Sequence, residues 1–547
     1  MRVRCCELGI GIAMLCLTTP QVSVSENVIH TKSDKVVILY DGGKAQERKV
    51  NISSSPEQLV TTASVLTFQS DLDTLSINLN EWENTSLKII NDRGESAYIK
   101  VSRRAINPYE NPSPDILAMT TPGLLSRAQA EFDIDALVNA ISNVHPDMFF
   151  QCRHVDFFNA INNLKQSLPD SVSSTQLYLR LTPVVAMLGD GHTHLLLPDD
   201  KVLNDEEMFM PVYLRVSPDK SLRTVWSKCQ SIPQGAQIIS INGLSADSII
   251  NSLMHLVSGE RDAFRLMRVD YDFTALYHLM YPAEEYAITY CFQDGEKRLT
   301  DKAVLISEPW MKIKRHFQEE NLAETEAPYT FTIDKSNNVA LMDFRSFEDQ
   351  GRMEHFADSM FRELRHNNID NLIIDLRENG GGNSLVGDVL LRYMSPEPFI
   401  QMDKVLTRIT PLTARLLNAR NVPAMMQLYE TPESEYIPPL TEEEGFYRGN
   451  IFLLTSSKTF SSAASFTWTF SECNIGTIIG EETGGLNVSF GDKVRYTLPV
   501  SGLECGISFK RFWQFRADES DIHGALPNVY VPSSEALSKA LSIINDN

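Results

Sequence analysis

The chain has 547 residues, of which 43% are hydrophobic and 22% charged, so three or four folded domains with sizeable cores are expected. Its formal net charge is −22, which argues against nucleic acid and against anionic membrane surfaces as partners, because like charges repel.

The first 25 residues have the pattern of a secretory signal peptide. Arg2 and Arg4 precede an apolar stretch, residues 8–17, that is too short to cross a bilayer. The sequence therefore predicts a signal peptide at 1–25, export with the periplasm as the favoured compartment, and no transmembrane span. Cys16 is a candidate lipid anchor, although Leu15 rather than a small residue precedes it.

Residues 26–110 alternate short apolar runs with Gly, Asn, Asp and Ser, and they lack helical periodicity. This pattern predicts a β-rich accessory domain, with a β-sandwich as its favoured form. A glycan-binding surface protein is a function class that rests on this domain alone. A Pro- and Asn-rich link, residues 107–122, separates it from the next part.

Residues 123–205 are predicted to form a helical domain that ends in a histidine turn. The segments FDIDALVNAIS and DFFNAINNLKQSL place apolar residues three and four apart, as one face of a helix requires. Gly189 and Gly191 then interrupt the helical pattern, and a strand is expected from Leu195. The helical domain thus delivers His192 on a glycine-flanked turn.

Residues 206–310 return to short strands, and residues 233–243 indicate a turn, a strand and an Asn-Gly turn ahead of a helix. This order resembles a PDZ-like domain, a module that binds extended peptide ends by adding a strand to its sheet. A purely structural role is the alternative, and the sequence leaves both open.

Residues 328–547 alternate strands with helices, which predicts an α/β sheet covered on both faces. The expected strands are 339–344, 371–376, 451–455 and 475–479, and the expected helices are 352–366, 384–394 and 460–472.

Three features carry candidate chemistry, and each also has a structural explanation. Glycines 380–382 follow a buried strand, where they either present N–H groups to a ligand oxygen or form a flexible connection. His192 is either a general base near neutral pH or a structural histidine, and its spacing from His194 does not by itself predict a metal site. Ser461, at the start of a helix, is either a nucleophile or an N-cap.

Several short motifs occur in a fixed order along the chain. They are D-G-H-T at 190–193, D-L-R-E-N-G-G-G at 375–382, T-F-S-S-A at 459–463, I-I-G-E-E-T-G-G at 478–485 and D-I-H-G-A-L-P-N at 521–528. From about residue 126 onward, this series resembles the C-terminal processing and tricorn-core family of serine peptidases, also called tail-specific proteases. The resemblance implies a multidomain α+β fold with a crotonase-like α/β catalytic core, a helical domain and a PDZ-like domain.

The resemblance also implies roles for individual residues. Ser461 matches the family's nucleophile, and His192 matches the histidine that serves as general base in the tricorn-like branch. Backbone N–H groups are expected to form the oxyanion hole, and an acidic residue is expected to orient the histidine. The candidates are Gly381 or Gly382 with Ser462 for the hole, and Asp521, with Glu519 as second choice, for the acid.

Two positions depart from the family pattern. Leu486 stands where one branch has the lysine of a Ser/Lys dyad, and neither Lys458 nor Lys493 aligns with it. Gly191 stands where some tricorn-like members have a serine, which leaves the link between His192 and its acid open.

The sequence prediction is an exported serine endopeptidase that hydrolyses peptides or unfolded proteins by acyl transfer, with no metal and no cofactor. The alternative is a catalytically inactive protein on the same fold that binds a peptide or an apolar ligand. A fixed oligomeric state is not indicated by any of these patterns.

Overall fold

The computed structural model describes residues 121–546, with gaps at 199–206, 311–326 apart from Ile313, 422–425 and 432–434, and before them Tyr109, residues 112–119 and the strands between residues 22 and 103. The chain divides into two compact units, residues 1–113 with 421–426, and residues 114–420 with 427–547. Of the predicted signal peptide only Val22–Ser23 is described, as strand β1, and Cys16 lies outside the described residues, so export and lipidation stay predictions.

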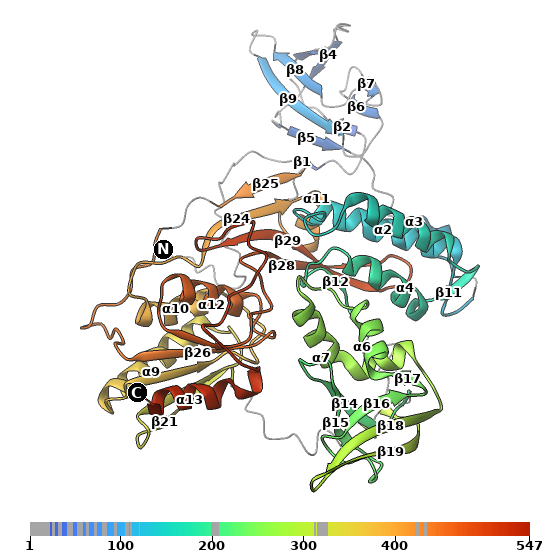
Figure 1. Cartoon of the computed structure of the whole chain (residues 1–547). Coiled ribbons are helices and arrows are strands. Elements are labelled where there is room, and N and C mark those ends of the chain that lie inside the picture. The colour runs from blue at the N-terminus through green and yellow to red at the C-terminus, as the bar shows by residue number, and fades with distance from the viewer. Residues whose placement is uncertain are drawn as a thin grey trace. The chain divides into compact units, whose positions relative to one another are not determined.

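The first unit is built from strands (Figure 1). One sheet has the order β1-β5-β9-β8-β3-β4 and a smaller one has the order β2-β6-β7. Their bounds are β1 Val22–Ser23, β2 Val28–His30, β3 Lys35–Tyr40, β4 Arg48–Asn51, β5 Gln58–Thr61, β6 Val65–Gln69, β7 Thr74–Asn78, β8 Thr85–Asn91 and β9 Ser96–Arg103.

The second unit begins with a helical layer. Ser126 and Ser173 each open a helix with a capping box, because each hydroxyl accepts from a backbone N–H three residues on and each N3 glutamine bonds back. The buried faces of these helices pack against the strands near Cys505 and Ile507 of the last domain. The elements are α1 Pro114–Leu117, β10 Leu124–Ser126, α2 Arg127–Val144, α3 His154–Gln166, β11 Ser171–Ser173, α4 Ser174–Ala186 and β12 His194–Leu195.

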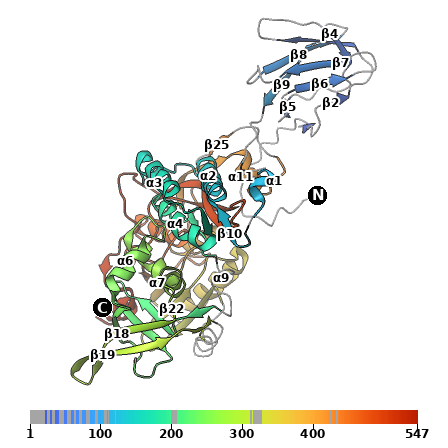
Figure 2. The ribbon, with the colours of Figure 1, turned by 90° about the vertical axis from the view of Figure 1, so that its right-hand side faces the viewer.

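An inserted module, Met208 to Pro309, follows the helical layer. Its sheet has the order β14-β15-β16-β18-β19, and its two helices lie next to the helical layer in both views (Figures 1 and 2). The elements are β13 Met208–Phe209, β14 Val212–Val216, β15 Leu222–Ser227, β16 Gln237–Ile241, β17 Leu244–Ser245, α6 Ala246–Met254, α7 Asp262–Met280, β18 Glu285–Asp294, β19 Lys297–Ile306 and β20 Glu308–Pro309.

The last domain is organised on a sheet of order β21-β22-β23-β26-β27-β30, parallel except for the pair β21 and β22. Successive residues of β23 face opposite sides, so that Leu372 and Ile374 pack with α9, α10 and α12 while Ile373 packs with α13. A strand buried on both faces must be apolar throughout, which is why β23 and β26 have continuous apolar runs. The prediction of an α/β sheet covered on both faces is confirmed.

The elements of this domain are β21 Tyr329–Asp334, β22 Val339–Phe344, α9 Gln350–His366, β23 Asn371–Asp375, α10 Leu385–Met394, β24 Met402–Ile409, α11 Pro411–Leu416, β25 Gln427–Glu430, β26 Asn450–Thr455, α12 Ser462–Glu472, β27 Thr477–Gly480, β28 Val488–Thr497, β29 Glu504–Gln514, β30 Val529–Tyr530 and α13 Ala536–Asp546. Among the residues that the structure describes, no helix is both long and apolar enough to cross a membrane.

A second sheet joins the helical layer to this domain. It has the order β12-β29-β24-β25, with β28 paired to β29. Strand β12 follows directly on the histidine turn, and it pairs His194 with Gly506 and Leu195 with Cys505. The turn is therefore fixed to the last domain by backbone pairing, although the two lie far apart in the sequence.

Candidate active site

Ser461 lies on the turn between β26 and α12. Its backbone has φ +52° and ψ −127°, a conformation that residues other than glycine rarely adopt. It occupies the N-cap position of α12, yet its side chain makes no capping hydrogen bond. Two hydrogen bonds fix the turn to the segment after β23. The Thr459 hydroxyl donates to Leu376 O at 2.8 Å, and Phe460 N donates to Asn379 O at 3.1 Å. The hydroxyl of Ser461 is therefore not used as a helix cap and is free to interact with other groups.

His192 faces this hydroxyl. Its Nε2 lies 3.3 Å from Ser461 Oγ, across a separation of 269 residues in the sequence. The imidazole ring stacks on Phe460, with 4.7 Å between ring centroids and 28° between ring planes. Gly189, at φ +66°, lets the chain turn sharply after α4. The structure therefore brings together the two residues that the resemblance paired.

Asp190 is buried beneath the histidine. Its Oδ1 accepts from the backbone N–H of His192 at 2.9 Å, and its Oδ2 accepts from the Ser508 hydroxyl at 2.7 Å. Nε2 of His145 lies 3.1 Å from the same Oδ2, and His145 Nδ1 accepts from Asp147 N, so neutral His145 donates to Asp190 through Nε2. Asp190 Oδ1 is 3.8 Å from His192 Nδ1, which is too far for a hydrogen bond.

These surroundings set the charges of the pair. Burial alone would raise the pKa of Asp190, but the hydrogen bond from His145 and the electrostatic influence of the His145 and His192 rings hold it below its ordinary value, so the carboxylate is ionised. Burial lowers the pKa of His192, and the charge of Asp190 opposes this only in part. At neutral pH the imidazole of His192 is therefore neutral.

The glycine loop after β23, residues 380–382, packs against Ser461. A Cβ on Gly381 would lie 2.8 Å from both Ser461 Cβ and Ser462 N, so only glycine fits there. The N–H of Gly381 donates to Asn379 Oδ1 at 2.8 Å, whereas the carbonyl of Gly382 accepts from the Ser462 hydroxyl at 2.5 Å. The N–H of Ser462 opens α12 and has no partner within the helix, so it is available to an anion.

Comparison with known proteins finds a family that part of the chain resembles. Residues 338–491 match the model of peptidase family S41. The match contains the glycine loop and Ser461. Over these residues the core domain is similar to peptidase family S41. The protein is accordingly a serine-type peptidase.

The fold of the chain is similar to that of the solved CPAF structures. The structure of mature CPAF complexed with lactacystin matches 77% of this chain and 97% of its own, with 14% identity and a TM-score of 0.55. The structure of mature CPAF matches 77% and 96%, with 13% identity and a TM-score of 0.54. A photosystem II D1 C-terminal processing protease matches 76% and 97%, with 13% identity and a TM-score of 0.38.

The structure brings neither predicted acid to His192. Asp521 Oδ1 accepts from the backbone N–H of His523 at 3.0 Å, within its own loop. Glu519 accepts from the indole N–H of Trp513 at 2.6 Å and lies 3.5 Å from Arg511. The carboxylate next to His192 is Asp190, which stands in the quoted D-G-H-T motif although the sequence analysis gave it no role.

The lysines that were weighed for a Ser/Lys dyad have other surroundings. Lys458 forms an ion pair with Glu378 at 2.8 Å. Leu486, at the dyad position of the other S41 branch, is buried. Burial lowers the pKa of Lys493, which lies on β28 close enough to influence His192 electrostatically.

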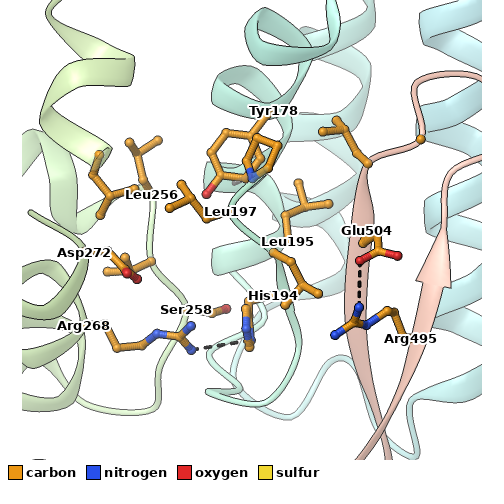
Figure 3. Close-up of a pocket in the computed structure, with 16 residues that line it drawn as sticks. Tyr178, His194, Leu195, Leu197, Leu256, Ser258, Arg268, Asp272, Arg495 and Glu504 are labelled. Carbon is orange, nitrogen blue, oxygen red and sulfur yellow. Dashed lines mark hydrogen bonds and ion pairs between the residues drawn. The ribbon is translucent and has the colours of Figure 1, made fainter. Parts of the chain in front are cut away.

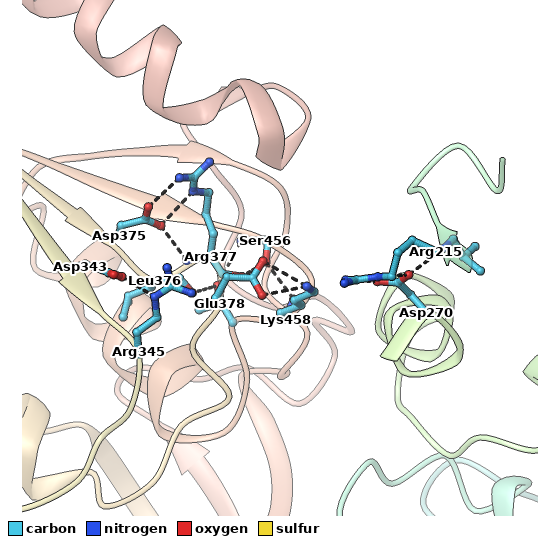
Figure 4. A network of polar contacts seen from close by, with 12 residues as sticks. Arg215, Asp270, Asp343, Arg345, Asp375, Leu376, Arg377, Glu378, Ser456 and Lys458 are labelled. Carbon is cyan, nitrogen blue, oxygen red and sulfur yellow. Dashed lines mark hydrogen bonds and ion pairs between the residues drawn. The ribbon is translucent and has the colours of Figure 1, made fainter. Parts of the chain in front are cut away.

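Polar contacts tie the ends of neighbouring core strands together (Figure 4). Asp375, the last residue of β23, forms a bidentate ion pair with Arg377, which follows the strand. The Ser456 hydroxyl donates to the carbonyl of Arg377 at 2.5 Å. The ion pair of Lys458 with Glu378 adds a second link between the glycine loop and the serine turn. These contacts fix the glycine loop and the Ser461 turn relative to each other at the carboxyl ends of the parallel strands. Figure 4 also shows a separate pair, Arg215 with Asp270, in the inserted module.

A cavity of about 690 Å³ lies beside the histidine turn (Figure 3). His194 lines it, whereas His192 faces the serine. The guanidinium of Arg268 crosses from this cavity to the turn, where its Nη1 donates to Gly191 O at 2.8 Å and lies 3.4 Å from His194 Nδ1. The remaining lining combines leucine side chains with the ion pair of Arg495 and Glu504.

Replacing Gly381 with alanine is expected to damage the site. The backbone of Gly381 has φ +102°, and the added Cβ would lie 2.7 Å from Phe460 O. A strained residue of this kind costs about 1–3 kcal/mol, which urea denaturation will measure as a lower free energy of unfolding. Gly380→Ala is the matched control, because a Cβ there meets nothing within 4 Å. Equal unfolding curves for the two variants would contradict the packing described here.

Proposed function

We propose that the protein is a serine endopeptidase in which Ser461 is the nucleophile and His192 is its general base. The observation that carries this proposal is the 3.3 Å approach of His192 Nε2 to Ser461 Oγ, between residues that belong to different domains. The neutral imidazole, the strained serine and the orphan N–H of α12 have the properties that acyl transfer needs. They speak against the alternative of an inactive binding protein.

In the first half of the reaction, Nε2 takes the proton of the Ser461 hydroxyl as Oγ bonds to the substrate's carbonyl carbon. The C–N bond then breaks, and the imidazolium returns the proton to the leaving amine. In the second half, water gives a proton to Nε2 as its oxygen bonds to the acyl carbon. The C–Oγ bond then breaks, and the imidazolium returns the proton to Ser461 Oγ as the new carboxyl group leaves. The ionised Asp190 stabilises the imidazolium in both halves.

The oxyanion of each tetrahedral intermediate is assigned to backbone donors. Gly382 is the better choice of the two predicted glycines, because the N–H of Gly381 is already bonded to Asn379. The N–H of Ser462 is the second donor, and it adds the positive end of the α12 dipole. Removing one such donor typically costs about 10²–10³ in kcat.

The substrates are proposed to be peptides or unfolded proteins. We assign the crotonase-like architecture to the core and a PDZ-like role to the inserted module, supported by its antiparallel sheet with α6 and α7. A module of that kind presents extended chains to a neighbouring site by strand addition.

A fluorophosphonate probe tests the proposal. We expect the probe to label the wild-type protein, and mass spectrometry to find the adduct on the peptide that contains Ser461. The reason is that only a serine whose proton is accepted by a neighbouring base is nucleophilic enough to react. An adduct at a different serine, or no adduct between pH 6 and pH 9.5, would favour the inactive binding protein instead.

A further inference from the structure

The inserted module reaches into the catalytic centre. Just ahead of α7, Glu260 Oε1 accepts from the backbone N–H of Gly191 at 3.1 Å. Four residues on, Phe264 stacks on Phe460 with 4.1 Å between ring centroids, and Phe460 in turn stacks on His192. Four residues further, Arg268 donates to the carbonyl of Gly191 at 2.8 Å. One face of this segment therefore grips the histidine turn.

Gly191 makes room for Glu260. A Cβ at position 191 would lie 2.9 Å from Glu260 Oε2, and 2.7 and 2.8 Å from the rings of Phe264 and Phe460. A serine, which some tricorn-like relatives have at this position, would displace the carboxyl group. The departure noted in the sequence is thus matched by a side chain from another domain.

Two buried polar atoms near the histidine lack a partner. Among the described residues, His192 Nδ1 and Glu260 Oε2 are both buried without a hydrogen bond. One ring nitrogen of His192 and one carboxylate oxygen each of Asp190 and Glu260 lie within 4.8 Å of one another. Both oxygens of Asp190 are already engaged, by His192 N, His145 and Ser508. Glu260 Oε2 is accordingly an unused acceptor on a carboxyl group near the His192 ring, whose Nδ1 also lacks a partner.

We propose that Glu260 is the positioning residue that accepts the Nδ1–H of His192 in the working enzyme, a role that rests on the proposed function of His192 as general base. The hydrogen bond fixes the neutral ring with its proton on Nδ1, which leaves Nε2 free to take the proton of Ser461. The two carboxylates then flank the imidazolium as it forms. Hydrogen bonds of this kind often tighten only when substrate is bound.

Ionisation of Glu260 is expected to make the activity of the enzyme depend on pH. Burial, followed by the charge of Asp190, raises the pKa of Glu260 to about 8. Below that pH its carboxyl group is protonated and donates to Nδ1, which moves the ring proton to Nε2 and blocks the base. Above it the carboxylate accepts, so activity rises as the pH passes through 8. The charged or titratable groups that face this pair are Asp190, His194, Arg268, Asp492 and Lys493, with His145 behind Asp190.

Glu260→Gln tests the proposal, because it keeps the shape of the side chain. Its amide oxygen retains the bond from Gly191, and its amide nitrogen then faces Nδ1 as a donor. We expect kcat for a peptide substrate at pH 9 to fall about 100-fold, with little change in KM, and the rise centred near pH 8 to disappear. Glu260→Asp keeps a carboxylate at this position, so it is expected to retain part of the rise in kcat that Glu260→Gln removes. Asp262→Asn, the matched control, removes an exposed carboxylate of the same segment and leaves the profile unchanged.

A rise near pH 8 that survives at the wild-type kcat in Glu260→Gln would overturn the proposal. A second readout does not depend on turnover. In full-length protein with ¹⁵N-labelled histidine, the ring nitrogens of His192, assigned by comparison with His192→Gln, are expected to exchange tautomer with a midpoint near pH 8. A ring without this transition would also overturn it. If the transition is present and Glu260→Gln abolishes it while the fluorophosphonate probe never labels Ser461, the contact stands and the peptidase function falls.

Discussion

Replacing Ser461 with alanine is expected to lower kcat/KM for peptide hydrolysis by about 10⁶-fold, the scale seen when a triad nucleophile is removed. The variant loses the only hydroxyl that the structure holds against His192 Nε2 within the described residues. Folding is expected to be retained, because the side chain of Ser461 makes no capping bond to α12. Continuous fluorescence assay of a quenched peptide measures the loss.

Ser457→Ala is the control for this variant, since Ser457 lies on the same turn and outside the proposed machinery. It is expected to hydrolyse the peptide at the wild-type rate. Hydrolysis by Ser461→Ala within a factor of ten of the wild type would show that the nucleophile lies elsewhere.

Replacing His192 with glutamine is expected to lower kcat by about 10⁴-fold or more, because no other group then accepts the proton of Ser461. His194→Gln, two residues along the same turn, is the matched control, and it should change kcat little because His194 faces the cavity rather than the serine. Similar losses in both variants would mean that the turn as a whole is required rather than the base.

The acid side of the pH profile reports on the same residue. His192 must be neutral to act as a base, so activity is lost as the pH falls through its pKa. Burial lowers that pKa below the ordinary value of 6.5, so the midpoint of the acid limb is expected below pH 6.5. This limb is separate from the rise near pH 8 that is assigned to Glu260. Stopped-time assays from pH 4.5 to pH 9.5 resolve the two.

The arrangement of the core could be predicted from local patterns. Predicted strand 339–344 coincides with β22 Val339–Phe344, and 371–376 differs from β23 Asn371–Asp375 by one residue, because continuous apolar runs flanked by polar residues mark buried parallel strands. The helix after the serine was expected from residue 460 and begins at Ser462, because the strained turn occupies the two positions before it.

The site was harder to predict from residues alone. The pairing of Ser461 with His192 came from the family resemblance, since no spacing rule joins residues that far apart. Asp521 stays a prediction for the acid, and in this structure its carboxylate accepts from the N–H of His523 in its own loop. Glu260 has no motif, and an acidic residue just before a helix looks like a favourable helix end. The one sequence signal related to Glu260 was Gly191, which departs from the family pattern.

Alkylation by a peptide chloromethyl ketone tests the central claim most directly, because the reagent reacts with a histidine ring only while it is held against an active serine. We expect mass spectrometry of the inactivated protein to find the peptide on Nε2 of His192, and Ser461→Ala to abolish this modification. Alkylation of a different histidine, or modification of His192 at the same rate in Ser461→Ala, would contradict it.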